Sequence, residues 1–234
     1  MSAIILFMAG IAAIAGWWLS QQRLAAKPWL EEGVIADLRE GGTPSLPAAK
    51  IGLGVFLAVA GSLFALFISA YSMRMNMVDW RTLPVPALLW FNTGALILSS
   101  LALQWAHMAA RRDDIDGISV GLCAGGAFAV TFLVGQLLAW RQLSGAGYFL
   151  ASNPANSFFY LITAVHGLHL MGGLVALGRT TAKVLRGAGA TQIRLSVELC
   201  TIYWHFLLVV WLVLLGLLTG WTDDFVNICR QLLS

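Results

Sequence analysis

The sequence predicts an all-α integral membrane protein with six transmembrane helices, one N-terminal helix followed by a five-helix bundle. The chain has 234 residues, of which 59% are hydrophobic and only 11% are charged. Its mean hydropathy is +0.80, whereas a soluble domain usually carries about 25% charged residues. The charges lie in short clusters between apolar runs, and each run is long enough to span a bilayer. This pattern predicts membrane helices joined by polar loops.

Six apolar runs define the expected helices in chain order. They cover Ala3 to Leu19, Ile51 to Met73, Pro86 to His107, Ile118 to Trp140, Ser157 to Leu177 and Val197 to Trp221. Residues 1–20 are expected to be an uncleaved membrane anchor, because no basic residue precedes the first run. Residues 21–50 are expected to form a cytoplasmic loop, since their Gly-Gly-Thr-Pro-Ser-Leu-Pro stretch cannot continue a helix. The five-helix bundle is expected over residues 51–221, with a tail at 222–234.

The distribution of Lys and Arg predicts the orientation. The first, third and fifth connections carry ten of the 14 Lys and Arg residues, and the other connections and the tail carry four. Cytoplasmic loops are enriched in these residues. We therefore expect a bacterial inner-membrane protein with both termini on the periplasmic side. Because the charges are confined to loops, the basic balance does not suggest nucleic-acid binding.

Small residues in the apolar runs predict close helix packing, within the bundle or against a partner subunit. Gly121 and Gly125 form a G-x-x-x-G motif. The second run carries a stripe of small residues at steps of three or four, namely Gly54, Ala58, Ser62, Ala65 and Ser69. Tryptophans near the expected helix ends, Trp140 among them, are expected to be membrane-interface anchors.

Ionisable side chains at membrane depth are costly and therefore mark candidate sites. His166 and His169 are three residues apart, and Glu198 and His205 are seven apart. Each pair shares a helix face, and both faces could meet across one interface. We expect a structural polar network, or a subunit or lipid interface, at His166, His169, Glu198, Tyr203, Trp204, His205, Gln136 and Asn92. No catalytic, cofactor-binding or metal-binding residue is predicted.

A metal or haem site is the main alternative for these groups. The H-x-x-H pair with Glu198 and His205 could bind a metal, or two histidines a haem. However, Glu198 is expected in the first turn of its helix, at the cytoplasmic side, whereas His166 and His169 are expected near mid-depth. Glu198 is therefore less easily placed at the same depth as the two histidines. Four histidines in total are too few for a haem-copper catalytic subunit or a histidine-rich di-iron hydroxylase. A small proton or ion transporter is a further alternative, although we find no internal repeat and no mid-helix proline.

Four further segments follow one another along the chain: LLWFNTGALILSSLALQWA from Leu88, GQLLAWRQL from Gly135, SFFYLITAVHGLHLMGGLVAL from Ser157 and VELCTIYWHFLLVVWLVLL from Val197. In this order they resemble subunit III of haem-copper respiratory oxidases (the cytochrome c oxidase subunit III family). The last is similar to the family pattern E-x-x-x-x-Y-W-H-F-V-D-V-V-W. Together the resemblance covers the second to the sixth helix. The same family includes an accessory protein of nitric oxide reductases, which stays open as an alternative.

The resemblance implies a non-catalytic subunit of an oxidoreductase complex. Such a subunit binds no redox centre itself, and haem and copper lie in partner subunits. It implies packing against subunit I, with subunit II and a small subunit IV as further candidate partners, and bound structural phospholipid. The expected role is to support assembly, turnover stability, lipid binding and oxygen or proton access in aerobic electron transport.

The chain departs from the family pattern at several positions. Ala60 aligns with a buried glutamate, Leu208 with the aspartate of H-F-V-D-V-V-W, and Ala139 with an acid that many members carry. One helix, instead of two, precedes the shared five. Glu198 is thus the only carboxylate within the expected spans, so that a proton function would have to involve it.

Overall fold

The computed structural model describes residues 48–75, 77–81, 83–187 and 189–220. Their helices are α2 (Ala48–Arg74), α3 (Leu88–Arg111), α4 (Ile115–Gly145), α5 (Pro154–Leu185) and α6 (Ala190–Leu218). Within these residues, five helices are long and apolar enough to cross a membrane. This agrees with the five-helix part of the predicted fold. The predicted N-terminal helix, nearly all of the predicted loop and the tail lie outside the described residues.

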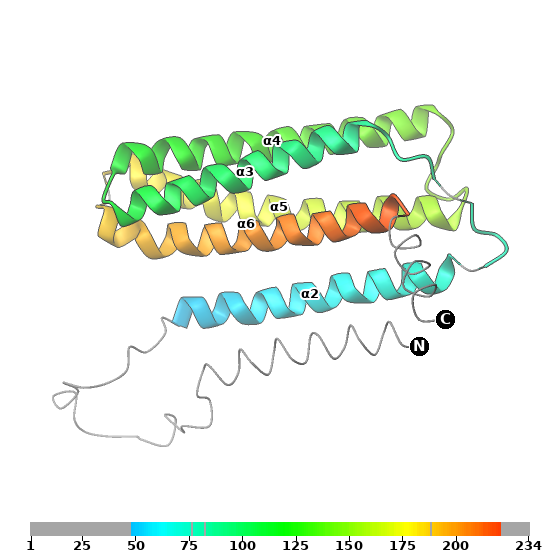
Figure 1. The fold of residues 1–234 in the computed structure, drawn as a ribbon, viewed down its shortest axis with the longest axis horizontal. Helices are drawn as coiled ribbons and strands as arrows, with labels where there is room; N and C mark the ends of the chain where they lie inside the picture. Colours follow the sequence, from blue (N-terminus) through cyan, green and yellow to red (C-terminus); the bar gives the residue numbers. More distant parts are fainter. Residues whose placement is uncertain (1–47, 76, 82, 188, 221–234) are drawn as a thin grey trace, which may run out of the picture. The chain divides into compact units, whose positions relative to one another are not determined.

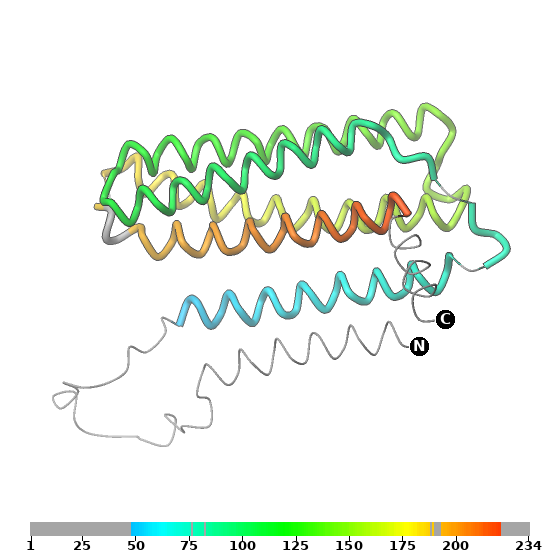
Figure 2. Tube along the Cα trace, viewed as in Figure 1, coloured from blue at the N-terminus to red at the C-terminus, as the bar shows by residue number. Residues whose placement is uncertain are grey.

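Consecutive helices run antiparallel, and α3 to α6 form a four-helix unit (Figure 1). In this unit α3 contacts α4 and α6, and α5 contacts the same two helices. Helix α2 lies against α5 and α6. The trace in Figure 2 shows that α3 and α5 end where α4 and α6 begin. We call this the basic end, because Arg111, Arg112, Lys183, Arg186 and Arg194 lie there; the other is the opposite end.

Helix α6 supplies the largest side chains of the core. Trp204, Leu207 and Trp211 are fully buried and pack in one cluster with apolar side chains of α3, α4 and α5. In α2, by contrast, only Ala60 and Phe64 are buried. Helix α2 is therefore the most weakly embedded of the described helices.

Glycines set the close approach of α3 and α4. A Cβ atom at Gly121 would lie 2.7 Å from Cβ of Ala106, and one at Gly125 would lie 2.9 Å from Cγ of Leu103. Both distances are too short for van der Waals contact between carbon atoms. The predicted role of this G-x-x-x-G motif in tight packing is confirmed, and its partner is α3 of the same chain.

The stripe of small residues on α2 does not make the contact of α2 with the bundle. Gly54, Ala65 and Ser69 are half-buried, while Ala58 and Ser62 are exposed. Larger side chains on another face, including Leu57, Phe64 and Phe67, pack against the two core clusters instead.

The predicted start of the last helix is wrong. Helix α6 begins at Ala190, seven residues before the predicted Val197, so Glu198 lies more than two turns inside it. Helices α4 and α5 also extend beyond the apolar runs. Asp114 caps α4 by accepting a hydrogen bond from the Gly117 amide, and Asn153 caps α5 in front of Pro154.

Candidate functional site

Glu198 links α6 to the first turn of α2. Its carboxylate forms an ion pair with the ammonium group of Lys50 at 2.5 Å, and both side chains are partly exposed. His107 of α3 lies near this ion pair. We call Lys50, His107 and Glu198 the basic-end cluster. Its ion pair joins α2 to α6, and His107 of α3 lies nearby.

Lys50 and His107 were not among the predicted site residues. The apolar run begins at Ile51, which places Lys50 in the loop, but α2 begins at Ala48 and carries Lys50 on its first turn. His107 stands at the polar end of its run and was predicted only as a helix end. In both cases the available signal was a basic residue on the edge of an apolar run.

His205 faces α3. Its Nδ1 lies 3.3 Å from Oγ of Ser100 and 2.8 Å from the Thr201 carbonyl oxygen. The imidazole is exposed at the bundle surface. His205 and Glu198 therefore share a side of α6, as predicted, but each reaches a different neighbouring helix.

The two histidines of α5 lie in different environments. His166 is fully buried, and its Nε2–H donates to the Leu207 carbonyl of α6 at 3.1 Å. Rings of Phe64, Phe132 and Trp211 surround it at centroid distances of 5.1 to 6.3 Å. His169 is half-buried, and its Nδ1 lies 2.8 Å from the Val165 carbonyl of its own helix.

These positions do not bring the two predicted pairs together. His166 contacts α6 at Leu207, whereas His205 turns away to Ser100 of α3. Among the residues that the structure describes, no group of three or more His, Cys, Asp or Glu side chains is close enough to hold a metal ion. The imidazole and carboxylate groups are instead engaged with neighbouring helices or with their own backbone.

Tyr203 and Trp204 link α6 to two different helices. The Tyr203 hydroxyl donates to the His169 carbonyl of α5 at 2.8 Å. The Trp204 indole N–H donates to Oγ of Ser99 at 2.8 Å, and the Ser99 hydroxyl donates to the Gly125 carbonyl at 2.7 Å. This chain of bonds connects α6, α3 and α4 in the interior.

Asn92 and Gln136 form a second buried link, between α3 and α4. Asn92 is fully buried and Gln136 is nearly so, and the Asn92 amide N–H donates to Oε1 of Gln136 at 3.3 Å. The Asn92 side chain lies directly against Gly135, where a Cβ atom would overlap its amide. The hydroxyl of Thr93, the next residue of α3, accepts the indole N–H of Trp211 at 2.9 Å.

Trp140 makes a comparable bond between α4 and α5. Its indole N–H donates to Oγ1 of the buried Thr163 at 3.1 Å. Helix α4 continues to Gly145, so Trp140 lies more than one turn before the helix end. Its indole is therefore bonded inside the bundle.

An apolar cavity of about 420 Å³ lies between α2, α5 and α6. Its walls include Leu53 and Phe56 of α2, Gly172 of α5, and Tyr203 of α6. Leu53 is one turn from Lys50, and the neighbouring wall residue Leu199 follows Glu198 in the chain. The cavity therefore begins beside the ion pair of the basic-end cluster and extends toward mid-membrane.

Residues 53–223, most of the chain, match the protein family described as cytochrome c oxidase subunit III. The chain belongs to the cytochrome c oxidase subunit III family. The resemblance predicted from the four sequence segments is thereby confirmed. Membership and the five apolar helices identify a multi-pass membrane protein of the respiratory chain that is part of a complex with other oxidase subunits.

Relatives of the chain carry the same description. It is 32% identical over 176 residues to a cytochrome c oxidase subunit 3 of Thermostichus vulcanus, covering 72% of this chain and 85% of that protein. It is 28% identical over 207 residues to the Synechocystis protein of that name, covering 82% and 88%. A probable cytochrome c oxidase subunit 3 of Mycobacterium tuberculosis is 36% identical over 126 residues, which is 52% of this chain and 60% of the mycobacterial protein.

Two of the positions that depart from the family pattern, Ala60 and Leu208, lie on α2 and α6. Ala60 is buried, so a carboxylate at that position would be enclosed by the bundle. Leu208 is half-buried and packs against the core. Of the polar groups in the α6 signature, Glu198, Tyr203, Trp204 and His205 are all in contact with other helices of this chain.

Proposed function

We propose that this chain is the non-catalytic subunit III of a respiratory haem-copper terminal oxidase of the cytochrome c oxidase type. It packs against the catalytic subunit I and supports the assembly and turnover stability of the complex. The observation that carries this proposal is the use of the α6 signature. Glu198 contacts α2, Tyr203 contacts α5, and Trp204 and His205 both contact α3. Their polar groups therefore serve to fix the bundle that a catalytic subunit would contact.

The cavity between α2, α5 and α6 supports a role in lipid binding. Its walls are apolar, and Gly172 leaves open space beside α5. Apolar molecules, including acyl chains and oxygen, partition from water into such an environment. We propose that bound structural phospholipid, and oxygen moving toward subunit I, use the apolar surface of this subunit. Haem and copper belong to the partner subunits, with subunit II and a small subunit IV as further neighbours.

The charges of the basic end support an orientation with that end at the inner surface of the membrane. Lys50, Arg111, Arg112, Lys183, Arg186 and Arg194 all lie at the basic end, and Lys- and Arg-rich ends face the cytoplasm. We propose a location in the bacterial inner membrane with this end inside. Any contribution to proton access then involves Glu198, the carboxylate paired with Lys50.

Purification through a tag on this chain tests the proposal. We expect co-purification with a haem-containing catalytic subunit and a copper-binding subunit II. The chain separated from them should show no Soret band. A cytochrome-c-type partner without a copper subunit would identify a nitric oxide reductase complex instead. A Soret band in the separated chain that disappears in His205→Ala would contradict a non-catalytic, haem-free subunit.

A further inference from the structure

His205 is an ionisable side chain on the outer surface of the bundle at mid-membrane depth. It has 15 residues of α6 before it and 13 after it, in a helix that is long and apolar enough to cross a membrane. Its imidazole is exposed and does not line the apolar cavity between α2, α5 and α6. Ionisable groups within membrane spans almost always face protein or a water-filled cavity, because an unpaired polar group in hydrocarbon is costly. The position of His205 therefore indicates a surface that another protein segment covers.

The bonds of His205 within the chain show which of its nitrogen atoms is left for a partner. Nδ1 lies 2.8 Å from the carbonyl oxygen of Thr201, which can only accept, so Nδ1 carries the hydrogen. The hydroxyl of Ser100 adjoins the same nitrogen at 3.3 Å. In the neutral imidazole Nε2 is then an acceptor, and no described residue donates to it. Nε2 therefore offers its lone pair to a hydrogen-bond donor beyond the surface of the bundle.

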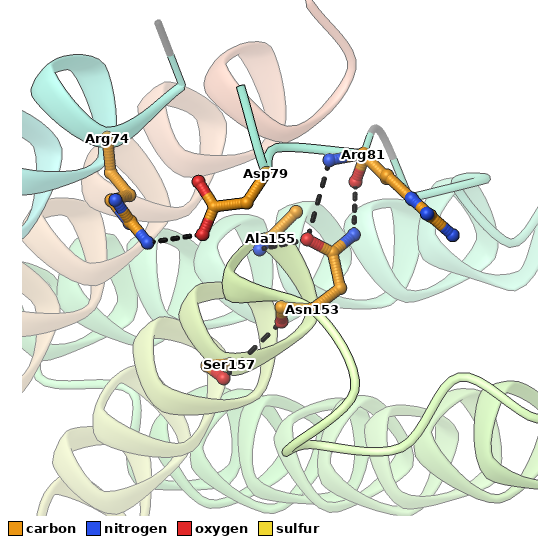
Figure 3. Close-up of polar contacts among 6 residues, drawn as sticks. All are labelled: Arg74, Asp79, Arg81, Asn153, Ala155 and Ser157. Carbon is orange, nitrogen blue, oxygen red and sulfur yellow. Dashed lines mark hydrogen bonds and ion pairs between the residues drawn. The ribbon is translucent and has the colours of Figure 1, made fainter. Parts of the chain in front are cut away.

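Exposed polar groups elsewhere in the described residues find partners within the chain. At the opposite end, the Asn153 side chain accepts a hydrogen bond from the Arg81 amide and donates to the Arg81 carbonyl, and Arg74 forms an ion pair with Asp79 (Figure 3). At membrane depth, the exposed hydroxyl of Thr131 donates to a carbonyl oxygen one turn earlier in α4. A hydroxyl group can satisfy itself on its own helix in this way. The imidazole on α6 uses one nitrogen for such a bond and still presents the other outward.

Exposed apolar side chains of two neighbouring helices surround this imidazole. On α6, Ile202 and Val209 lie one turn to either side of His205 and share its helix face. On α3, Ile97 and Leu101 are exposed near the contact with His205. Helices α3 and α6 contact each other, so the five side chains form one surface with a single polar group in it. We call Ile97, Leu101, Ile202, His205 and Val209 the α3–α6 face.

We propose that the α3–α6 face is the contact surface for a transmembrane helix of another subunit of the oxidase complex. That helix donates a hydrogen bond to Nε2 of His205 from an uncharged group, namely a hydroxyl, an amide or an indole N–H. Hydrogen bonds of this kind hold membrane helices together, and the apolar side chains around His205 keep lipid headgroups and water away from the bond. The proposal rests on the function proposed above and deepens it, because it names the face through which the subunit joins the complex.

Photo-cross-linking in the native membrane tests where this contact lies. The photoreactive amino acid p-benzoylphenylalanine replaces Val209 or, as the matched control, Val130, which is exposed in the middle of α4, diagonally across the bundle from α6. We expect a higher yield of adduct with another oxidase subunit from position 209, attached within a transmembrane helix. Equal yields, or an adduct from position 209 only with this chain or a second copy of it, would overturn the proposal. Co-purification with a haem-containing subunit in that case would leave the function proposed above intact.

Substitution of His205 tests the hydrogen bond itself. His205→Leu removes the acceptor and should make this subunit dissociate from the solubilised complex about tenfold faster, the change that loss of one hydrogen bond implies. His205→Gln keeps an acceptor and should have a smaller effect. Thr131→Val, which removes an exposed hydroxyl bonded to its own helix, and Ser100→Ala, which removes only the contact of His205 inside the bundle, should leave the dissociation rate nearly unchanged. An unaltered rate in His205→Leu, or an equal increase in Ser100→Ala, would overturn the proposal.

Discussion

The indole N–H groups of Trp204 and Trp211 each donate to a hydroxyl on α3, that of Ser99 and that of Thr93. Trp140 makes the same kind of bond to Thr163 of α5. In a membrane, apolar side chains gain little by moving from lipid into the protein, so packing and hydrogen bonds between helices carry more of the specificity. At the scale of single residues, the bundle is therefore held by buried polar links distributed over its helices.

Removing one of these donors should weaken the bundle. Trp204→Phe keeps an aromatic ring but leaves Oγ of the buried Ser99 without its donor, and we expect a loss of about 1–2 kcal/mol of stability. Trp105→Phe is the control, because Trp105 is about half exposed on α3. Thermal unfolding of the purified complex, followed through dissociation of this subunit, measures both. Equal effects of the two substitutions would contradict the role of the indole bond.

His166 offers a test of hydrogen bonding against apolar packing. Its Nε2–H donates to the Leu207 carbonyl inside an aromatic enclosure. His166→Gln retains an N–H donor, whereas His166→Leu leaves the bond unmade, so we expect the glutamine variant to accumulate at higher levels in the membrane. The same pair of substitutions at the half-buried His169 should differ less. Better tolerance of leucine at position 166 would indicate that the ring acts only by filling space.

At the scale of helices, the apolar runs predicted the five described helices, while their ends and neighbours were harder to predict. Helix α4 has 31 residues and α5 has 32, more than the roughly 20 needed to span hydrocarbon, so these helices continue into polar sequence. Helices α6 and α2 likewise begin in polar sequence, before their apolar runs. For this reason the predicted start of α6 was too late and Lys50 was placed in the loop before α2. Periodicity shows which residues share a face, but it does not say which helix that face meets. For this reason the sequence could not predict that His166 contacts α6 while His205 contacts α3.

The α3–α4 contact gives a prediction at this scale. Gly121→Ala would bring Cβ to 2.7 Å from Cβ of Ala106, and overpacking of this kind costs about 1–3 kcal/mol. Gly94→Ala on α3 is the control, since nothing lies within 4 Å of its Cβ position, and alanine favours the helix. Thermal unfolding should separate the two variants. A neutral Gly121→Ala would mean that the two helices can move apart without loss.

For the whole molecule, the basic-end cluster connects the weakly embedded α2 to the rest of the bundle. Lys50 and Glu198 form an ion pair across α2 and α6, beside the apolar cavity that separates other parts of these helices. Few buried side chains of α2 hold it in place. We therefore expect Glu198 to hold the subunit together, and through it the complex, instead of taking part in a step of catalysis.

Turnover kinetics of the purified oxidase with Glu198→Gln tests this claim most directly. We expect an initial rate close to that of the unaltered complex, with lower assembly or a shorter active lifetime during turnover. The exchange of charges in Lys50→Glu with Glu198→Lys should restore much of that lifetime, because it restores the ion pair. A fully assembled and long-lived Glu198→Gln complex whose initial rate and proton uptake had collapsed would contradict the account.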